Sequence, residues 1–406
     1  MTKYLLLILI LISSLVNISA QKPDHLVIDM TFKDTIVNVN ATYHKIVQSP
    51  ADSLYFLLNP AINVDTIKAE NLESYQITKK EGRPFPFWLI KFKKPLDNKS
   101  VASIHFEYSI NLNTQNHLKS DWIELNADKL WFPNNGDLNN QFTYNISISN
   151  FPSSYSLITH SDAETENKKD KIIIKKKQPE YEVLILAGKD MMEWNYNEDI
   201  TIYASNDTKD STLTSIGKKV ENSIALLNRT IGSSDPIQKF IVVLRNTSKK
   251  ELGFQFNRKN LIVTGKDFNS YANLSHEIAH YWWSMANFIE EPWLNESFAN
   301  YSMYQVVEKY NSDAYKSIIE KHREIADSAI PVSEASLFTE NAYPSYYYKG
   351  AILLLDLEQK IGQKIMYNIL SYCIKKEISS SEGFLKELQR HTSEQIRQSF
   401  AKKLNE

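Results

Sequence analysis

The chain has 406 residues, a length that predicts two or three domains instead of one compact core. Hydrophobic residues make up 42% and charged residues 23% of the sequence, an ordinary globular composition that excludes disorder and fibrous repeats. The 46 Lys and Arg residues nearly balance the 48 Asp and Glu residues, which predicts no nucleic-acid-binding surface, and the single cysteine, Cys373, excludes an internal disulfide.

The N-terminal segment 1–20 has the pattern of a secretory signal. Lys3 is followed by an apolar run over 4–16 and by small residues at Ser19 and Ala20. That run is short for a membrane-spanning helix, and no later segment reaches the required length. We therefore expect cleavage after Ala20 and export to the periplasm or the extracellular space, which leaves no transmembrane domain. An uncleaved segment that keeps the protein at the membrane is the alternative.

Residues 21–195 predict an N-terminal antiparallel β domain. Apolar and polar residues alternate there in short runs, which is the period of a strand with one buried face. Turn residues such as Asn134 and Asn135 separate the runs. The clearest predicted strands cover residues 26–32, 35–43, 87–92, 102–110, 142–148 and 181–187.

Residues 196–406 predict a second domain of the α+β class that is rich in helices. Strands are expected at 200–204, 240–244 and 261–264, and a helix with one apolar face is expected at 211–229. Beyond residue 270 the pattern is almost wholly helical. The predicted helices there cover residues 270–286, 292–310, 312–328, 349–361, 364–377 and 382–403.

Two of these helices carry residue types that bind metals. His276 and His280 are four residues apart, so on a helix both imidazoles project from one face with Cβ atoms about 5–6 Å apart. Glu277 lies a quarter-turn round, where it would face a metal-bound water. If the chain returns antiparallel after the first helix, Glu296 comes opposite the histidines as a third ligand. Three protein ligands and one open position indicate a catalytic zinc site that holds one Zn2+ per chain.

Each of these residues has a purely structural alternative. A histidine pair can be satisfied by hydrogen bonds inside a core, and Glu296 can be an exposed helical carboxylate. The register of both glutamates with the histidines favours the metal site.

The same residues resemble the aminopeptidase N family of gluzincins, which includes leukotriene hydrolase. Segments 276–282 and 293–299 look like the family's zinc signature and its third-ligand helix. Segment 347–351 is similar to the family's Tyr-x-Lys-Gly block, which implies that Tyr347 donates a hydrogen bond to the developing oxyanion. The bottom-up alternative for Tyr347 is aromatic packing, because Tyr346 and Tyr348 flank it.

The resemblance also covers the N-terminal half. Trp131, Phe132 and Pro133 are similar to a segment of the family's β-saddle domain and would otherwise indicate only a buried strand end. The implied architecture is a β-saddle domain followed by a thermolysin-like catalytic domain, without the C-terminal helical domain of many relatives. The resemblance implies a peptide substrate, and the sequence gives no indication of the oligomeric state.

The departures from the family pattern concern substrate recognition. Phe256 stands where the family has the glutamate that binds a substrate's free α-amine, and an aromatic ring forms no salt bridge with an ammonium group. Glu124 aligns with the glutamate of a second substrate-binding block, although Trp122 replaces the usual glutamine there. The spacer between His280 and Glu296 is also about three residues shorter than the family pattern. The strand segment expected to bind substrate comprises Gly253, Phe254, Gln255, Phe256 and Asn257.

Two functional hypotheses follow. The first is an exported zinc metallopeptidase with altered recognition of the free amine, in which exopeptidase specificity stays open. The second is a catalytically weak or inactive protein that binds peptides or acts as a scaffold. In the first, another carboxylate can take over the amine, and the candidates are Glu124, Glu251, Glu290 and Glu291.

Overall fold

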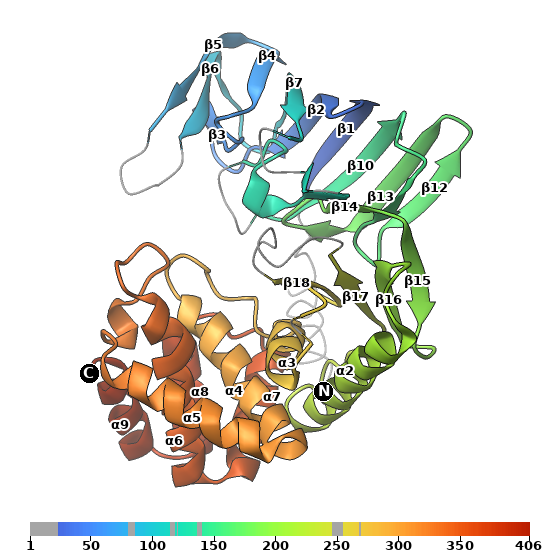
Figure 1. Ribbon diagram of the computed structural model, residues 1–406. Helices are drawn as coiled ribbons and strands as arrows, with labels where there is room; N and C mark the ends of the chain where they lie inside the picture. Colours follow the sequence, from blue (N-terminus) through green and yellow to red (C-terminus); the bar gives the residue numbers. More distant parts are fainter. Residues whose placement is uncertain are drawn as a thin grey trace, which may run out of the picture. The chain divides into compact units, whose positions relative to one another are not determined.

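The computed structural model describes residues 23–79, 86–113, 118–119, 121–135, 140–245, 255–267 and 269–406 (Figure 1). The chain divides into two compact units, of which unit 1 contains 1–118, 123–153 and 162–186, and unit 2 contains 119–122, 154–161 and 187–406. The predicted signal segment lies outside the described residues. Over the ranges described, no helix combines the length and the apolar character needed to cross a membrane.

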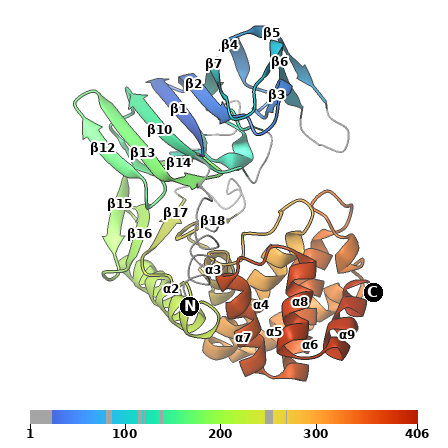
Figure 2. The same ribbon diagram turned by 180° about the vertical axis from the view of Figure 1, so that it is seen from behind.

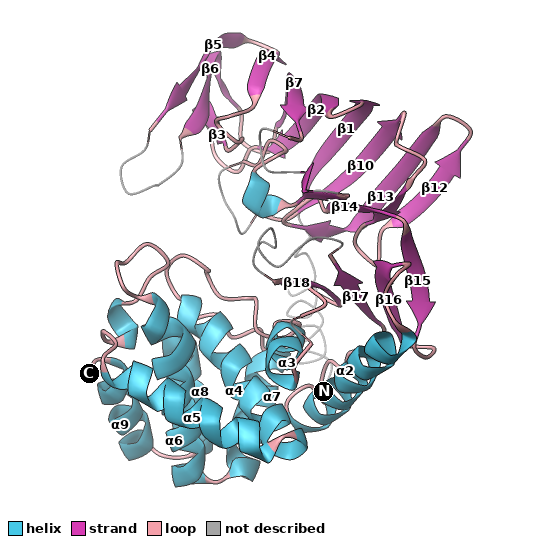
Figure 3. Cartoon of the chain, viewed as in Figure 1, coloured by secondary structure: helices cyan, strands magenta, loops and turns pink. Residues whose placement is uncertain are grey.

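A seven-stranded sheet forms the core of unit 1 (Figure 3). Its strand order is β12-β13-β10-β1-β2-β7-β4. Alternate residues of β1 and β7 are buried, as the period-two pattern predicts for a pleated sheet with one covered face. The strands are β1 (Asp24–Lys33), β2 (Ile36–Ile46), β4 (Asn63–Ala69), β7 (Val101–Asn111), β10 (Phe142–Ser149), β12 (Glu164–Lys168) and β13 (Lys171–Glu180).

One strand pair corrects the antiparallel expectation. β1 runs parallel to β10, with Asp24 opposite Phe142 and Thr31 opposite Ser149. The remaining pairs of this sheet are antiparallel. The alternation of apolar residues reports which side chains face the core, and it is the same for either direction of the neighbouring strand. The sheet is therefore mixed.

The strand expected at 181–187 begins only at Ile185. The residues before it make other contacts: the Trp131 side chain donates to the Val183 carbonyl, and the Glu182 carboxylate accepts from the Ala127 amide.

Two smaller sheets contain the other strands of the first half. One sheet has the order β3-β6-β5 and the other β11-β14-β9-β8. Their strands are β3 (Ala51–Phe56), β5 (Leu72–Thr78), β6 (Phe87–Leu96), β8 (Leu118–Lys119), β9 (Trp122–Leu125), β11 (Tyr155–Ile158) and β14 (Ile185–Lys189).

Unit 2 contains a five-stranded sheet of order β15-β16-β17-β19-β18. The three central strands are parallel and the two edge strands antiparallel to their neighbours. The strands predicted at 240–244 and 261–264 are confirmed as β17 and β19. Helix α2 (Asp210–Thr230) buries one apolar face, as predicted. The strands are β15 (Met191–Asn195), β16 (Ile200–Ser205), β17 (Phe240–Leu244), β18 (Phe256–Arg258) and β19 (Leu261–Thr264).

Helices make up the rest of unit 2, and α4 lies among them (Figure 2). It packs against α3, α5, α6 and a single π-helical turn, η3. Its residues from Pro292 to Val307 are all buried, so this stretch has no solvent-exposed face and buries its polar side chains as well. The elements are α3 (Tyr271–Ala279), α4 (Pro292–Tyr310), α5 (Ser312–Asp327), η3 (Ser345–Lys349), α6 (Gly350–Ile361), α7 (Gln363–Lys375), α8 (Ser381–His391) and α9 (Glu394–Leu404).

Two predicted helices differ from the structure. The helix expected at 270–286 ends at Ala279, because Trp282 and Trp283 turn away to bond other parts of the unit: their ring N–H groups donate to the Asp235 carbonyl and the Ser302 hydroxyl. The helix expected at 382–403 is two helices, since Ser393 caps the start of α9.

Candidate metal centre

The two histidines of the motif lie at the C-terminal end of α3. Ser270 caps the start of this helix by accepting a hydrogen bond from the Asn273 amide. His276 is in the last turn and His280 is the residue that follows the helix. Their imidazoles stand nearly perpendicular, at 88°, with the two Nε2 atoms 3.2 Å apart. The two ring nitrogens therefore converge on one point.

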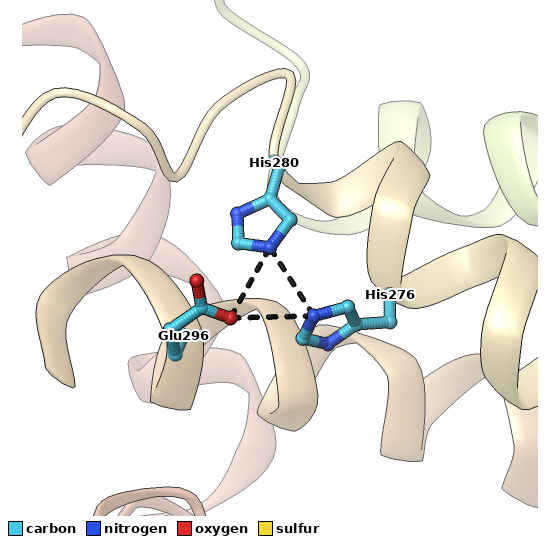
Figure 4. A group of neighbouring side chains, drawn as sticks. All are labelled: His276, His280 and Glu296. Carbon is cyan, nitrogen blue, oxygen red and sulfur yellow. Dashed lines mark hydrogen bonds and ion pairs between the residues drawn. The ribbon is translucent and has the colours of Figure 1, made fainter. Parts of the chain in front are cut away.

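Helix α4 supplies a carboxylate at the same point. Pro292 occupies the first turn, as the sequence predicts, and Asn295 holds the preceding loop by bonding both the N–H and the C=O of Ala286. The carboxylate of the next residue, Glu296, lies with one oxygen 3.4 Å from the Nε2 atoms of His276 and His280 (Figure 4). The three ligand atoms lie within 4.8 Å of one another.

The Glu296 carboxylate and His280 shift one another's pKa values. Burial opposes the charged form of His280, but the Glu296 carboxylate outweighs it and raises the histidine's pKa to about 9. Burial likewise opposes ionisation of Glu296, and the attraction of His280 and His276 brings its pKa well below the ordinary value. The cluster thus gains stability from a positive charge close to Glu296.

The donor set fits a divalent cation. The Oε2 atom of Glu296 is buried and accepts no hydrogen bond from any described residue. A buried carboxylate oxygen without a hydrogen bond is costly, and a cation between it and the two ring nitrogens would satisfy all three groups. Two imidazoles and one carboxylate are a ligand set that zinc prefers in hydrolytic sites.

Both histidine rings are oriented by their other nitrogen. The Nδ1 of His276 is 3.0 Å from the amide oxygen of Asn300, and the Nδ1 of His280 is 2.9 Å from the backbone carbonyl of Trp283. Both partners are acceptors, so each Nδ1 donates; in the neutral form of each ring this leaves the Nε2 lone pair facing the shared point. This tautomer is the one that binds a metal.

Glu277 and Tyr347 lie close to this cluster. Burial raises the pKa of Glu277, against the attraction of His276 and His280. The Tyr347 ring stacks on His276 with ring centroids 5.9 Å apart, and burial raises its pKa far above the ordinary value. Tyr347 therefore keeps its proton at neutral pH. The aromatic packing that was the alternative for Tyr347 is also present, because its ring stacks on Tyr343 with centroids 4.2 Å apart.

The strand segment expected to bind substrate, 253–257, carries an aromatic side chain close to two arginines. Gly253 and Phe254 lie outside the described residues, and so does Glu251. Phe256 begins the edge strand β18 and is 8% exposed. The guanidinium groups of Arg245 and Arg258 lie 5.4 and 4.6 Å from the centre of its ring.

Its neighbours make local hydrogen bonds. Gln255 accepts one from the Thr264 hydroxyl at 2.7 Å, and the Asn257 carbonyl accepts one from Arg258. Helix α3 packs against this strand.

Three other carboxylates that could bind a substrate's free amine lie in the described residues. Glu124 belongs to unit 1, where it is buried in β9 and accepts a hydrogen bond from the Asn126 side chain at 3.2 Å. In unit 2, Glu291 accepts hydrogen bonds from the backbone N–H and the hydroxyl of Ser381, which commits its carboxylate to the start of α8. Glu290 is exposed on the loop before α4.

Comparison with known proteins gives a match in fold. No family model matches the chain, and no curated protein matches it in sequence. An M1 zinc metallopeptidase from Deinococcus radiodurans superposes with a TM-score of 0.69 at 13% identity, covering 95% of this chain and 94% of that chain. Yeast LTA4 hydrolase superposes with a TM-score of 0.72 at 14% identity, covering 93% of this chain and 66% of the hydrolase. The chain has the fold of these zinc metallopeptidases.

Asn300 also contacts the candidate site, and the sequence did not single it out. It bonds the His276 ring and, through its amide nitrogen, the Tyr347 carbonyl at 2.8 Å. Its spacing of four from Glu296 was the available signal, because residues four apart share a helix face. Nothing in the sequence indicated the π-helical turn that places the Tyr347 carbonyl beside it.

Proposed function

We propose that the protein is a zinc metallopeptidase whose metal is held by His276, His280 and Glu296. The observation that carries this proposal is the convergence of three ligand atoms within 4.8 Å, from the partly buried His276 and the buried His280 and Glu296; the Glu296 oxygen has no hydrogen bond from a described residue. The fold shared with M1 zinc metallopeptidases supports it. One Zn2+ per chain is expected.

The residues around the cluster supply the remaining chemistry of peptide hydrolysis. When bound, zinc lowers the pKa of a coordinated water and polarises the scissile carbonyl. Glu277 accepts the proton of the attacking water and returns it to the leaving amine, a role that suits a carboxylate whose pKa burial has raised. Tyr347 keeps its proton and donates a hydrogen bond to the developing oxyanion without adding charge.

The substrate is a peptide, and its free amine is not held as in aminopeptidases. A variant of the Deinococcus enzyme has been solved with a Tyr-Ser-Ala substrate, at 14% identity to this chain. In this chain, the described residues 255–258 include no carboxylate, and two guanidinium groups lie over the ring of Phe256. We expect longer peptides to be cleaved better than small amino-acyl reporters. Export through the segment 1–20 belongs to the same proposal.

Metal analysis joined to a peptide-library cleavage profile tests this function. We expect one zinc per chain and cleavage that is lost on chelation and restored by zinc. Glu277→Gln, compared at equal zinc content, is expected to retain the metal and lose hydrolysis. A wild-type protein without zinc contradicts the proposal.

Phe256 favours a second candidate, a peptide-binding protein of the same fold without useful turnover. Such a protein would bind peptides from the library and leave them intact. Equal peptide binding and equal absence of cleavage in wild type and Glu277→Gln would establish this candidate in place of the peptidase.

A further inference from the structure

One buried amide joins two parts of the proposed active site. Asn300 is 4% exposed and lies on α4, one turn beyond Glu296. Its Oδ1 is 3.0 Å from the Nδ1 of His276, and its Nδ2 donates to the Tyr347 carbonyl at 2.8 Å. We propose that Asn300 is a positioning residue that sets the ring of a metal ligand and the segment of the oxyanion donor in one fixed relation. This inference rests on the proposed function and adds a residue to it.

The chemistry of the two neighbours requires an amide at this position. His276 must donate from Nδ1 if its Nε2 lone pair faces the metal, so it needs an acceptor. The Tyr347 carbonyl can only accept, so it needs a donor. An amide offers one of each, and a single orientation satisfies both. A carboxylate would serve His276 and repel the carbonyl.

The π-helical turn brings the Tyr347 carbonyl to α4. Ser297 donates to the preceding carbonyl, that of Tyr346, at 2.6 Å, so two side chains of α4 bond consecutive carbonyls of η3. Gly350 permits this approach, because a Cβ there would collide with the Ser297 hydroxyl. The turn is thus attached to the helix that carries the third ligand. Single π-helical turns of this kind are frequent at functional sites.

The contacts of Asn300 differ from those of a structural amide on the same helix. Asn295 forms both of its side-chain hydrogen bonds with the backbone of one residue, Ala286, and so holds a loop. Asn300 instead connects two elements that lie 71 residues apart, at His276 and Tyr347. Through Glu296 and Asn300, α4 determines the place of one ligand, the ring orientation of another and the approach of the tyrosine.

Two substitutions separate the two bonds of Asn300. Asn300→Asp keeps an acceptor for His276 and removes the donor to Tyr347, so we expect the zinc dissociation constant to change by less than about threefold while kcat falls roughly 10–100-fold with little change in KM. Asn300→Leu removes both bonds, so the zinc affinity should also fall by about 10–100-fold. Zinc affinity is measured by chelator competition, ring geometry by the visible spectrum of the Co2+ form, and kcat and KM on an internally quenched peptide.

Asn228→Asp is the matched control. The Asn228 side chain in α2 also donates to a backbone carbonyl, that of Ile237 at 2.9 Å, and accepts from the same residue's N–H. The control therefore makes the same amide-to-acid change opposite a carbonyl, at a place where no residue of the candidate site is bonded. We expect it to lower the melting temperature and to leave zinc affinity and kcat unchanged.

The outcomes distinguish this inference from the function on which it rests. If wild type binds zinc and cleaves peptides while both Asn300 variants match it in zinc affinity and kcat, Asn300 positions nothing and the peptidase stands. If Asn300→Asp loses zinc as strongly as Asn300→Leu, the two bonds are not separate and the inference is wrong. If Asn300→Leu does not fold, Asn300→Asp still decides, because an unchanged kcat in that variant overturns the inference. If the wild type neither binds zinc nor hydrolyses peptides, the proposed function and the inference about Asn300 are both wrong.

Discussion

The metal cluster and the strand β18 are neighbouring parts of unit 2, and they differ in how completely they match the chemistry of a metallopeptidase. At the cluster every ligand atom, ring orientation and proton donor has a place, set by α3, α4 and η3. At the strand, the guanidinium groups of Arg245 and Arg258 lie over the ring of Phe256, and the described residues 255–258 include no carboxylate. Helices and η3 hold the first and a sheet edge holds the second, so we expect substrate recognition to vary independently of the proposed metal ligands.

The difference has a physical cause. The groups of the cluster constrain one another, because moving one histidine removes part of the attraction that keeps the buried Glu296 carboxylate ionised. The strand position contributes one side chain at the edge of a sheet, and none of the three candidate ligands is on that strand. We expect a change of that side chain to alter substrate preference while the three candidate ligands keep their places. The following predictions test the two halves of this contrast separately.

The largest effect is expected at the third ligand. Glu296→Gln keeps the shape and removes the charge opposite both imidazoles, so we expect zinc affinity to fall by on the order of 1,000-fold, more than for a residue that only orients a ligand. Chelator competition measures this. Glu358→Gln is the control, because Glu358 is also a buried carboxylate, bonded to Tyr301 and Gln305 instead of the cluster. Equal zinc affinity in Glu296→Gln and wild type would remove Glu296 from the ligand set.

The next effect is expected at the oxyanion donor. Tyr347→Phe keeps the ring that stacks on His276 and Tyr343 and removes only the hydroxyl. We expect kcat to fall roughly 100-fold with little change in KM, as when one oxyanion donor is deleted. Steady-state kinetics on a quenched peptide measure this, with Tyr346→Phe as the control on the same π-helical turn. An unchanged kcat would mean that Tyr347 serves only aromatic packing.

Much of this cluster could be predicted from the sequence, because its residues follow local rules. The helix at 292–310 was predicted with its observed bounds, since Pro292 is a favourable first residue of a helix. The spacing of His276 and His280 determines a shared direction on any helix. Their geometry with Glu296 required in addition that the second helix pack against the first, and the loop over 280–291 makes this connection.

What could not be predicted depends on distant contacts. The first helix ends at Ala279 because Trp282 and Trp283 bond residues outside any local window. The role inferred for Asn300 requires a π-helical turn some 50 residues later, and the apolar pattern of 345–361 gives no sign of it. The parallel pairing of β1 with β10 is another case, because alternation carries no information about direction.

A smaller effect is expected at the strand. Phe256→Glu places a carboxylate where the ring now lies, and a salt bridge to a substrate ammonium would raise kcat/KM for an alanyl reporter roughly tenfold. Arg245 and Arg258 lie within 6 Å of that ring and will compete for the charge, which limits the gain. Phe256→Gln, of similar shape and no charge, should show no gain. If the wild type already prefers the alanyl reporter over a quenched peptide, the contrast between cluster and strand is wrong.

The smallest effect is expected on stability, at an aromatic layer formed by Tyr304, His322 and Tyr348. The test decides whether this layer takes part in the reaction or only supports the fold. The Tyr304 hydroxyl and the Nδ1 of His322 share a hydrogen bond of 2.7 Å, and the ring centroids of His322 and Tyr348 are 4.3 Å apart. Burial, together with the positive charges of Lys321 and His276, lowers the pKa of His322 from 6.5 to about 4. The folded state therefore holds this ring neutral, and a protonated ring has two donors and no acceptor, so it could no longer accept from Tyr304.

The sign of the pH dependence follows from that shift. Above pH 6.5 neither folded nor unfolded chain protonates this ring, and between 6.5 and about 4 only the unfolded chain does, so the free energy of unfolding falls as the pH falls through that window. The slope is below about 1.4 kcal/mol per pH unit, because the ring is partly exposed and solvent screens it. His322→Asn keeps an acceptor near the Nδ1 position and does not titrate, so denaturant unfolding of the metal-free protein should give a shallower slope than wild type. Parallel slopes would show that His322 does not titrate in this window, and unchanged kcat at neutral pH would place the layer outside the reaction.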